Sequence, residues 1–245
     1  MQWQQVEQLI RQDWSPEQIS GWLARWGELR ISHEWIYQHI LANKQCGGDL
    51  YKHLRCQKKR RKRYGSYDRR GRLPGRVGIE QRPGSLPQRQ RLGDWEVDTL
   101  LGKGRRSALV TLTERRSRLA RLVKVAGKTA PEVCAAITQS LEPLKAQVHT
   151  LTSDNGKEFA EHAAIARKLQ ADFYFAHPQA AWERGSNENM NGLLRQYFPK
   201  ARDFSTLSQE ELEFAMQRLN NRPRKCLDFK TPIDVFLEQT VALIT

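Results

Sequence analysis

Apolar residues recur at helical spacing in three short stretches within the first 45 residues. The segment VEQLIRQ is the first stretch. In the second, Ser15 can cap a helix start and Gln18 completes a capping box. Ser32 can cap the third. Three short helices joined by tight turns predict a helix-turn-helix module, whose last helix would enter the major groove of DNA.

Tryptophan is concentrated in this module. Five of the seven tryptophans lie in it, at positions 3, 14, 22, 26 and 35. A domain this small cannot bury enough Leu and Ile, so large aromatic side chains can supply the apolar volume of its core. We therefore expect the tryptophans to fill the core of the module rather than to stack on bases.

From Gly93 onward, short apolar runs alternate with amphipathic segments. Five strands are expected, in WEVDTLL, SALVTLTERRSR, ARLVKV, HTLTSDNG and DFYFAH. Helices are expected at about 129–144 and 157–169, and from near Ser186, Ser208 and Thr231. Three consecutive strands followed by alternating helices and strands predict a mixed α/β sheet of five strands, flanked by helices on both faces.

Residues 46–92, between these two parts, carry most of the net charge of +14. From Arg55 to Arg91 there are 14 Lys or Arg and two acids, a balance of +12. The densest run consists of Lys58, Lys59, Arg60, Arg61, Lys62 and Arg63. Such a block favours polyanions, because each neutralised phosphate releases a counterion. With seven Gly and Pro between positions 71 and 87, the segment is expected to be a linker ordered only on DNA, or a solvated disordered one.

The four cysteines have neither the density nor the spacing of a disulfide framework or a metal clip. The start of the chain, MQWQQVEQLI, does not have the layout of a signal peptide. No apolar run approaches the roughly 18 residues needed to span a bilayer. These features predict a soluble cytoplasmic protein with reduced thiols.

Two acids lie in or beside predicted strands. Asp98 lies inside WEVDTLL, where a buried charge must be paired or bind a metal ion. Asp154 follows HTLT in an Asp-Asn-Gly sequence, which is also ordinary turn chemistry. Each acid alone has a structural explanation, an ion pair for Asp98 and a turn for Asp154.

A third acid, Glu188, lies in a predicted helix with two different faces. Met190, Leu193, Leu194 and Tyr197 form an apolar stripe that can pack on the sheet. Glu188 shares the opposite face with Asn191 and Arg195, a pattern that is also typical of a solvated helix. The order of the acids, on the first strand, after the fourth strand and on a later helix, lets all three converge at one edge of the sheet. Carboxylate oxygens favour two Mg²⁺ or Mn²⁺ ions, which can clamp the attacking and leaving oxygens of a phosphoryl transfer.

Four segments, GDWEVDTL, LTSDNGKEF, HPQAAWERGSNENMNGLLRQYFP and NNRPRKCLDFKTP, resemble the catalytic core of insertion-sequence transposases, most closely the insertion sequence thirty family. More distantly, the core is similar to retroviral integrases, in which a Gly precedes the Glu by three residues and an Asn follows it by three, here Gly185 and Asn191. The separation of 33 residues between Asp154 and Glu188 also suits that family. The resemblance spans about Trp14 to Phe236.

The resemblance implies a ribonuclease H-like core at 93–245, preceded by the helix-turn-helix module at 1–45 and the basic linker at 46–92. It implies that Asp98, Asp154 and Glu188 are the catalytic residues and bind two Mg²⁺ or Mn²⁺ ions. It further implies that Asn155, Arg184, Asn191 and Arg195 contact or adjoin the DNA, and that at least two copies of the chain pair two DNA ends. Where integrases have a lysine, four residues after the Glu, this chain has Gly192.

The expected activity is metal-dependent cleavage at insertion-sequence ends and strand transfer into target DNA, by a bacterial protein associated with the nucleoid. Two alternatives stay open. A metal nuclease of the same fold would use similar carboxylates. The second alternative is a shortened transposase that binds DNA without activity. Related transposases carry a further helix-turn-helix upstream of WSPEQI, and this chain starts close to that segment.

Overall fold

The structure of the chain is a computed structural model that describes residues 2–27, 29–55, 73–82, 89–105, 107–178 and 180–242. Contacts divide the chain into two compact units, Met1–Gly65 with Arg218–Thr245 and Ser66–Gln217. The basic run Lys58–Arg63 lies outside the described residues, and the domain boundaries at 45 and 92 stay a prediction. Of the helices in the described ranges, none is both long and apolar enough to cross a membrane.

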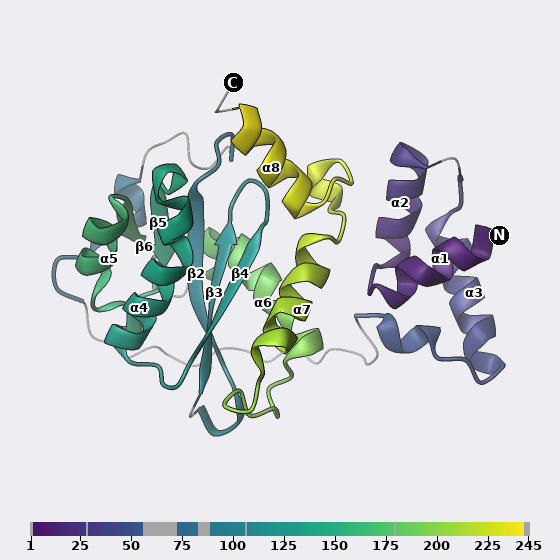
Figure 1. Ribbon diagram of the computed structural model, residues 1–245, viewed down its shortest axis with the longest axis horizontal. Helices are drawn as coiled ribbons and strands as arrows, with labels where there is room; N and C mark the ends of the chain where they lie inside the picture. The colour runs from purple at the N-terminus through teal and green to yellow at the C-terminus, as the bar shows by residue number, and fades with distance from the viewer. Residues whose placement is uncertain are drawn as a thin grey trace. The chain divides into compact units, whose positions relative to one another are not determined.

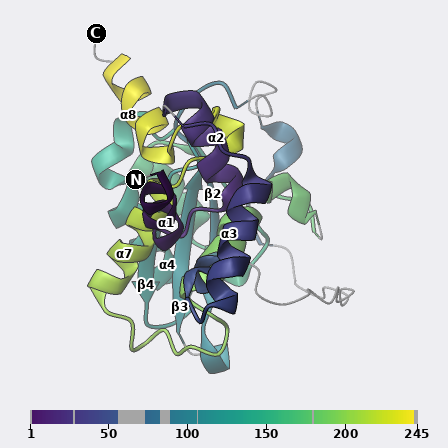
Figure 2. The same cartoon turned by 90° about the vertical axis from the view of Figure 1, so that its right-hand side faces the viewer.

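The first unit begins with the three predicted helices, α1 (Gln2–Arg11), α2 (Pro16–Trp26) and α3 (His33–Gln45), which Figures 1 and 2 show from two directions. The predicted capping box is present: Ser15 Oγ accepts from Gln18 N, and the Gln18 side chain accepts from Ser15 N. At the start of α3, Ser32 Oγ accepts from Trp35 N. The helix starts therefore lie where the sequence places them.

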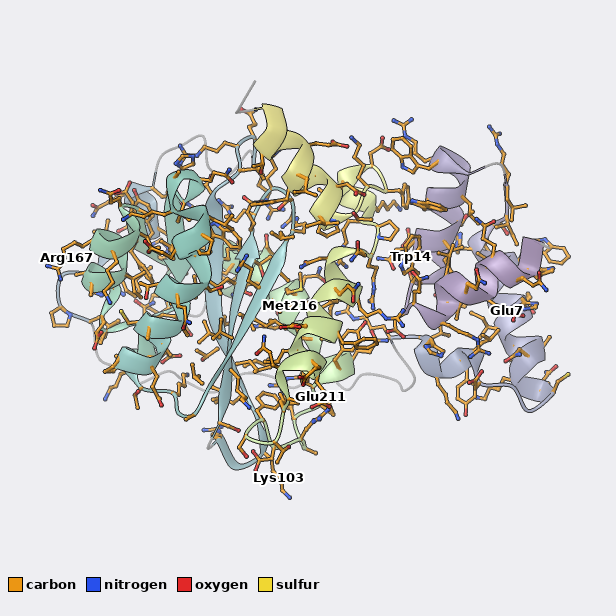
Figure 3. The ribbon with its side chains drawn as sticks, viewed as in Figure 1. Glu7, Trp14, Lys103, Arg167, Glu211 and Met216 are labelled. Carbon is orange, nitrogen blue, oxygen red and sulfur yellow. The ribbon has the colours of Figure 1, made fainter. Side chains whose placement is uncertain are left out.

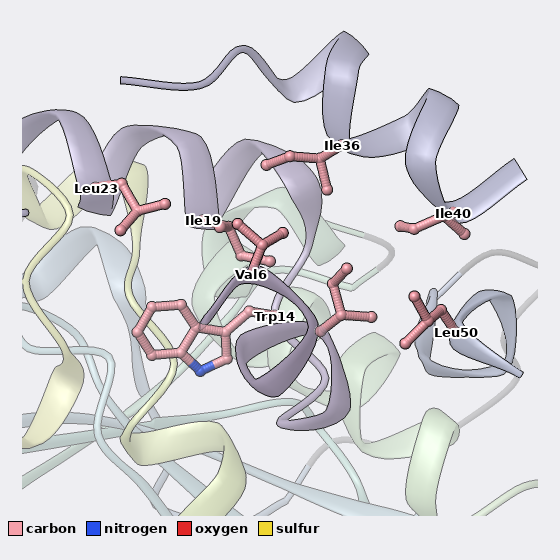
Figure 4. Close-up of a cluster of buried hydrophobic side chains, with 8 residues drawn as sticks. Val6, Trp14, Ile19, Leu23, Ile36, Ile40 and Leu50 are labelled. Carbon is pink, nitrogen blue, oxygen red and sulfur yellow. The ribbon is translucent and has the colours of Figure 1, made fainter. Parts of the chain in front are cut away.

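The core of these helices is a cluster of buried apolar side chains, Val6, Ile10, Trp14, Ile19, Leu23, Ile36, Ile40 and Leu50 (Figure 4). Trp14 is part of it, and Trp3 and Trp22 pack against it. The prediction that all five tryptophans fill the core is wrong for Trp26 and Trp35, which are 51% and 68% exposed. Trp35 immediately precedes the buried Ile36, so the helix turns it away from the core.

Residues after Arg218 also belong to the first unit, including α8 (Pro232–Ala242). Gln18 Nε2 donates to Pro223 O at 2.8 Å. The ring of Phe229 lies so close to Gly21 that a Cβ there would come within 2.1 Å of it. Glycine at position 21 therefore allows this approach.

The second unit is built on a six-stranded mixed sheet with the order β1-β6-β5-β2-β3-β4 (Figure 1). Strands β2, β3 and β4 form an antiparallel meander, and β5 and β6 continue the sheet in parallel from β2. All five predicted strands are confirmed. Their bounds are Asp94–Leu101 (β2), Ala108–Glu114 (β3), Ala120–Val125 (β4), Thr150–Ser153 (β5) and Asp172–Phe175 (β6).

The sixth strand, β1 (Val77–Gly78), corrects the prediction of a five-stranded sheet. It lies in the segment expected to be a linker, and Val77 pairs in parallel with Tyr174. Two residues among Gly, Pro and Arg give no alternating pattern. The strand forms because β6 would otherwise present unpaired backbone groups at the edge of the sheet.

Helices cover both faces of the sheet. On one face lie α4 (Ala130–Leu141) and α5 (His162–Leu169), and on the other α6 (Gly185–Tyr197) packs on β2 and β3 (Figure 1). The α4 helix ends earlier than predicted because Pro143 follows it and provides no N–H for a further helical bond. Helix α7 (Gln209–Asn220) covers the outer strand β4, where Leu122 N donates to Met216 Sδ at 3.2 Å (Figure 3).

A glycine lets β2 begin next to β5. Gly93 has a φ of +95°, and its carbonyl oxygen accepts from His149 N at 2.8 Å and Thr150 N at 3.2 Å. A Cβ at this position would come within 1.8 Å of Gln147 O. Only glycine permits both the left-handed backbone and the close approach. This junction brings together the two strands that lead to the candidate site.

Candidate active site

Asp98 lies on β2 with a partly buried side chain. Its Oδ1 accepts from Thr99 N at 2.8 Å, and its Oδ2 accepts from Asn191 Nδ2 at 3.0 Å. Burial raises the pKa of Asp98, and the nearby guanidinium of Arg184 opposes that rise. The carboxylate is thus oriented by a backbone donor of its own strand and by a side-chain donor of α6.

Asp154 lies next to Asp98 because of the register between two parallel strands. Glu96 pairs with Thr152, and each acid lies two residues further along its strand direction. Parallel strands run in the same direction, so positions two residues beyond a paired couple lie side by side. Asp154 Oδ1 accepts from Gly156 N at 2.9 Å, which fixes the turn that follows β5.

Arg184 lies between the two carboxylates. Its Nη1 is 3.3 Å from Asp98 Oδ2 and its Nη2 is 3.9 Å from Asp154 Oδ2. The side chain is only 12% exposed, and its Nε has no hydrogen-bond partner in the part of the chain that the structure describes. The positive charge between Asp98 and Asp154 is therefore the guanidinium group of Arg184.

Glu188 lies in the first turns of α6 and is exposed to solvent. The predicted apolar stripe of this helix is confirmed for Met190, Leu193 and Leu194, which are buried. Asn191, one turn after Glu188, reaches Asp98. Glu188 lies three residues before Asn191 on the same side of the helix, and it makes no ion pair with a described residue.

The ligand set of Asp98, Asp154 and Glu188 stays a prediction. Across the described ranges, no three His, Cys, Asp or Glu side chains are close enough to hold a metal ion. The donors nevertheless suit a hard divalent cation, because they are carboxylate oxygens and the pair Asp98 and Asp154 already holds the positive charge of Arg184.

Two residues predicted to contact or adjoin DNA make internal contacts. Arg195 donates from Nη2 to Leu101 O at 3.0 Å and from Nη1 to Phe198 O at 3.3 Å. Asn155 donates from Nδ2 to Ala176 O at 2.7 Å, which links the ends of β5 and β6. Their contacts with DNA stay predictions.

Sequence reasoning missed a buried polar cluster between α6 and the sheet. It consists of Glu96, Thr111, Thr113, Arg115 and Asn187. One signal was available: in the strand DWEVD, Asp94, Glu96 and Asp98 alternate with apolar residues and so share one face. The partners of Glu96 come from distant segments, and no local pattern marks them.

Known proteins resemble the unit that carries these acids in sequence and in fold. Residues 88–181, which include Asp98 and Asp154, match the family "Integrase core domain". The catalytic core domain of BIV integrase superposes with a TM-score of 0.48 and 21% sequence identity, covering 62% of this chain and 99% of that one. The mixed sheet with helices on both faces and the family match at residues 88–181 together indicate a ribonuclease H-like integrase core.

Two relatives show to which family of proteins with such a core the chain belongs. The chain is 43% identical over 232 residues to the transposase for insertion sequence element IS4351 of Bacteroides fragilis, covering 94% of this chain and 71% of the relative. It is 38% identical over 252 residues to the transposase InsI for insertion sequence element IS30A of Escherichia coli (strain K12), covering 97% of this chain and 64% of the relative. The chain belongs to the DDE transposases of the IS30 type.

Proposed function

We propose that this transposase cleaves DNA at the ends of an insertion sequence and joins the freed 3′ ends to target DNA, with Asp98, Asp154 and Glu188 as its catalytic residues. The proposal is carried by the register that puts Asp98 and Asp154 at the same edge of two parallel strands. Asn191 supports it further, because its bond to Asp98 attaches the helix of Glu188 to the same edge.

The three carboxylates would hold two Mg²⁺ or Mn²⁺ ions. Bound there, the ions would activate water or a 3′ hydroxyl and stabilise the leaving oxygen of an in-line phosphoryl transfer. An integrase-type core depends on divalent metal in general, and the oxygen donors of this site suit one.

The residues around the acids would have two roles. Some would orient the carboxylates, and Arg184 would leave them when DNA binds. Asn191 and the backbone N–H of Thr99 hold the Asp98 carboxylate at two oxygens. Arg184 balances the paired negative charges of Asp98 and Asp154 before DNA binds. Once displaced from them, its guanidinium could bind a phosphate of the DNA in a bidentate manner.

DNA is the proposed partner of both units. The basic run Lys58–Arg63 would supply sequence-independent affinity, and α3 would be the helix that enters the major groove. Pairing two transposon ends requires at least a dimer, and the DNA partner places the protein at the nucleoid. Replacing the six cations of this run by Gln should weaken DNA binding and lower its dependence on salt.

A cleavage assay tests the proposal. The purified chain is incubated with labelled insertion-sequence ends and Mn²⁺, and nicked and joined products are resolved. Asp98→Asn, Asp154→Asn and Glu188→Gln should each lower cleavage more than about 100-fold. Glu142→Gln, at an exposed acid of the same unit, is the control and should cleave normally.

Two outcomes would contradict the proposal. If the chain binds the ends but neither nicks nor joins them, it is a DNA-binding fragment without activity. If Asp98→Asn cleaves as well as the unaltered chain, the proposed set of catalytic residues is wrong. Nicking without joining would favour a nuclease of the same fold.

A further inference from the structure

The helix that carries Glu188 is attached to the sheet by a buried carboxylate. Glu96 on β2 is 0% exposed, and its Oε2 accepts from the backbone N of Asn187 at 2.8 Å. That N–H belongs to the first turn of α6, where no preceding residue of the helix can accept it. Glu96 thus satisfies an N-terminal donor of α6 from a strand 91 residues earlier.

The same carboxylate is held in place from the other side. Arg115 Nε donates to Glu96 Oε1 at 3.1 Å, and both side chains are almost completely buried. Breaking an ion pair in such surroundings leaves an uncompensated buried charge, so the two groups keep their positions. Glu96 therefore has little freedom to follow α6 if the helix shifts.

Asn187 also contacts the sheet through its side chain. Its Oδ1 accepts from Thr113 Oγ1 at 3.1 Å and from Thr111 Oγ1 at 3.3 Å. On β3, Thr113 pairs with Glu96 and Thr111 pairs with Asp98. Asn187 therefore lies over the two cross-strand pairs that contain Glu96 and Asp98.

These contacts fix α6 at two points, one turn apart. Asn187 is attached to Glu96, and Asn191 is attached to Asp98. Two attachments on one helix restrict both its sliding along the sheet and its rotation about its axis. Glu188 lies between them in sequence and makes no hydrogen bond or ion pair with a described residue, so its direction is set by its neighbours.

We propose that Glu96 is a positioning residue for the reaction, which holds α6 so that Glu188 faces Asp98. This inference rests on the proposed function, since it gives Glu188 a role in metal binding. Glu96 touches neither DNA nor metal, because it is fully buried under α6. Its effect passes through Asn187 to the adjacent Glu188.

Mn²⁺ binding to the full chain without DNA tests the proposal, by calorimetry or by the electron paramagnetic resonance signal of free Mn²⁺. In Glu96→Gln, the amide offers one acceptor oxygen to two donors, Asn187 N and Arg115 Nε, so one bond is lost. We expect Mn²⁺ affinity to fall about 10-fold, as when a group that orients a ligand is removed. Hydrogen exchange of the Asn187 amide should become faster.

A matched control separates positioning from loss of stability. Glu114 is also fully buried, but its carboxylate accepts from Gly93 and Ser117 and contacts no residue of α6. Glu114→Gln should unfold at a lower temperature and keep its Mn²⁺ affinity. If Glu96→Gln does not fold, Glu96→Asp replaces it, since its side chain is one methylene shorter and cannot reach both Asn187 N and Arg115 Nε.

The outcomes distinguish this inference from the proposed function. Asp98→Asn should abolish Mn²⁺ binding, and if it does not, the proposed metal site is wrong and the positioning role falls with it. If Asp98→Asn abolishes binding but the folded Glu96 variant binds Mn²⁺ normally, only the positioning role is overturned. An equal loss of affinity in Glu114→Gln would also overturn it.

Discussion

Asn191 donates a hydrogen bond from Nδ2 to Oδ2 of Asp98 at 3.0 Å, so a residue of α6 directly orients an acid of β2. The Oδ1 of the same amide is buried and has no partner among the described residues. An unsatisfied buried oxygen beside a carboxylate is unfavourable unless a cation or water comes to it. Asn191 is therefore suited to a site that gains a positive ion.

Replacing Asn191 should affect function more than folding. In Asn191→Ala, Asp98 loses the donor that comes from α6, and we expect cleavage to fall about 10-fold. The free energy of unfolding should fall by only about 1 kcal/mol, the usual net contribution of one hydrogen bond. Asn189→Ala, at an exposed position of the same helix, should change neither quantity. Equal cleavage by the two variants would exclude the role of Asn191.

Arg184 and a divalent ion should compete for the same carboxylates. Arg184→Gln removes the cation between Asp98 and Asp154, so the metal-free protein should lose about 2 kcal/mol of unfolding free energy. Mn²⁺ should then bind more tightly and raise the melting temperature of this variant more than that of the unaltered chain. Both quantities can be measured by thermal unfolding with and without Mn²⁺.

An exposed arginine provides the control for this experiment. Arg167 lies on the surface of α5 (Figure 3), and Arg167→Gln should respond to Mn²⁺ as the unaltered chain does. A response of Arg184→Gln no larger than that of Arg167→Gln would show that Arg184 and the ion do not share the site.

The stability of the segment between β6 and α6 should depend on pH through the pair of His177 and Glu183. A hydrogen bond to Glu183 raises the pKa of His177 above its ordinary value of 6.5, and Glu80 also favours the charged ring, whereas Arg76 opposes it. Because the folded pKa is raised, the stabilisation is fully present below about 6.5 and is lost as the pH rises through the folded pKa.

Thermal unfolding at several pH values checks this prediction. The difference in melting temperature between the unaltered chain and His177→Gln should be larger at pH about 5.5 than at pH about 8.5, on either side of the ordinary range of histidine. Pro178→Ala, at the exposed neighbour whose side chain does not titrate, is the control, and its difference should not change with pH. A constant difference for His177→Gln would contradict the role of the pair.

Two glycines with positive φ should differ in their tolerance of alanine. Gly93→Ala adds a Cβ within 1.8 Å of Gln147 O, whereas Gly75→Ala meets nothing within 4 Å. Both changes strain the backbone by about 1 kcal/mol, and the clash at Gly93 should raise the total loss of unfolding free energy to about 3 kcal/mol. Chemical denaturation measures both, and equal losses would mean that the junction between β2 and β5 can relax.

Local features of this chain could be predicted from its sequence, and long-range ones could not. Ser208 and Glu211 form a capping box at the predicted helix start, with bonds of 3.0 and 3.2 Å, because a cap depends on residues three apart. The bond from Asn187 to Glu96 joins residues 91 apart, and no periodicity encodes it. The same holds for Arg184, which was expected to contact DNA and which the structure places on Asp98 and Asp154.

The candidate site also has a part that could be predicted from local sequence and a part that could not. The type and order of the three acids were visible because each lies in a recognisable strand or helix pattern. What the sequence alone could not provide is the support beneath them, since Glu96 and Arg115 look like surface charges in a chain with 28% charged residues. Burial turns them into a specific pair, and burial depends on the packing of α6.

The register between β2 and β5 has a consequence for insertions and deletions. Every paired residue of β5 carries a number 56 higher than its partner in β2, and Asp98 and Asp154 keep that difference. Length changes in the loops between these strands leave the backbone pairing intact, so they leave the two acids side by side. One residue added within Thr150–Ser153 would turn Asp154 to the opposite face of the sheet. Descendants of this gene can therefore vary their loops freely while the strands that carry the acids must keep their length.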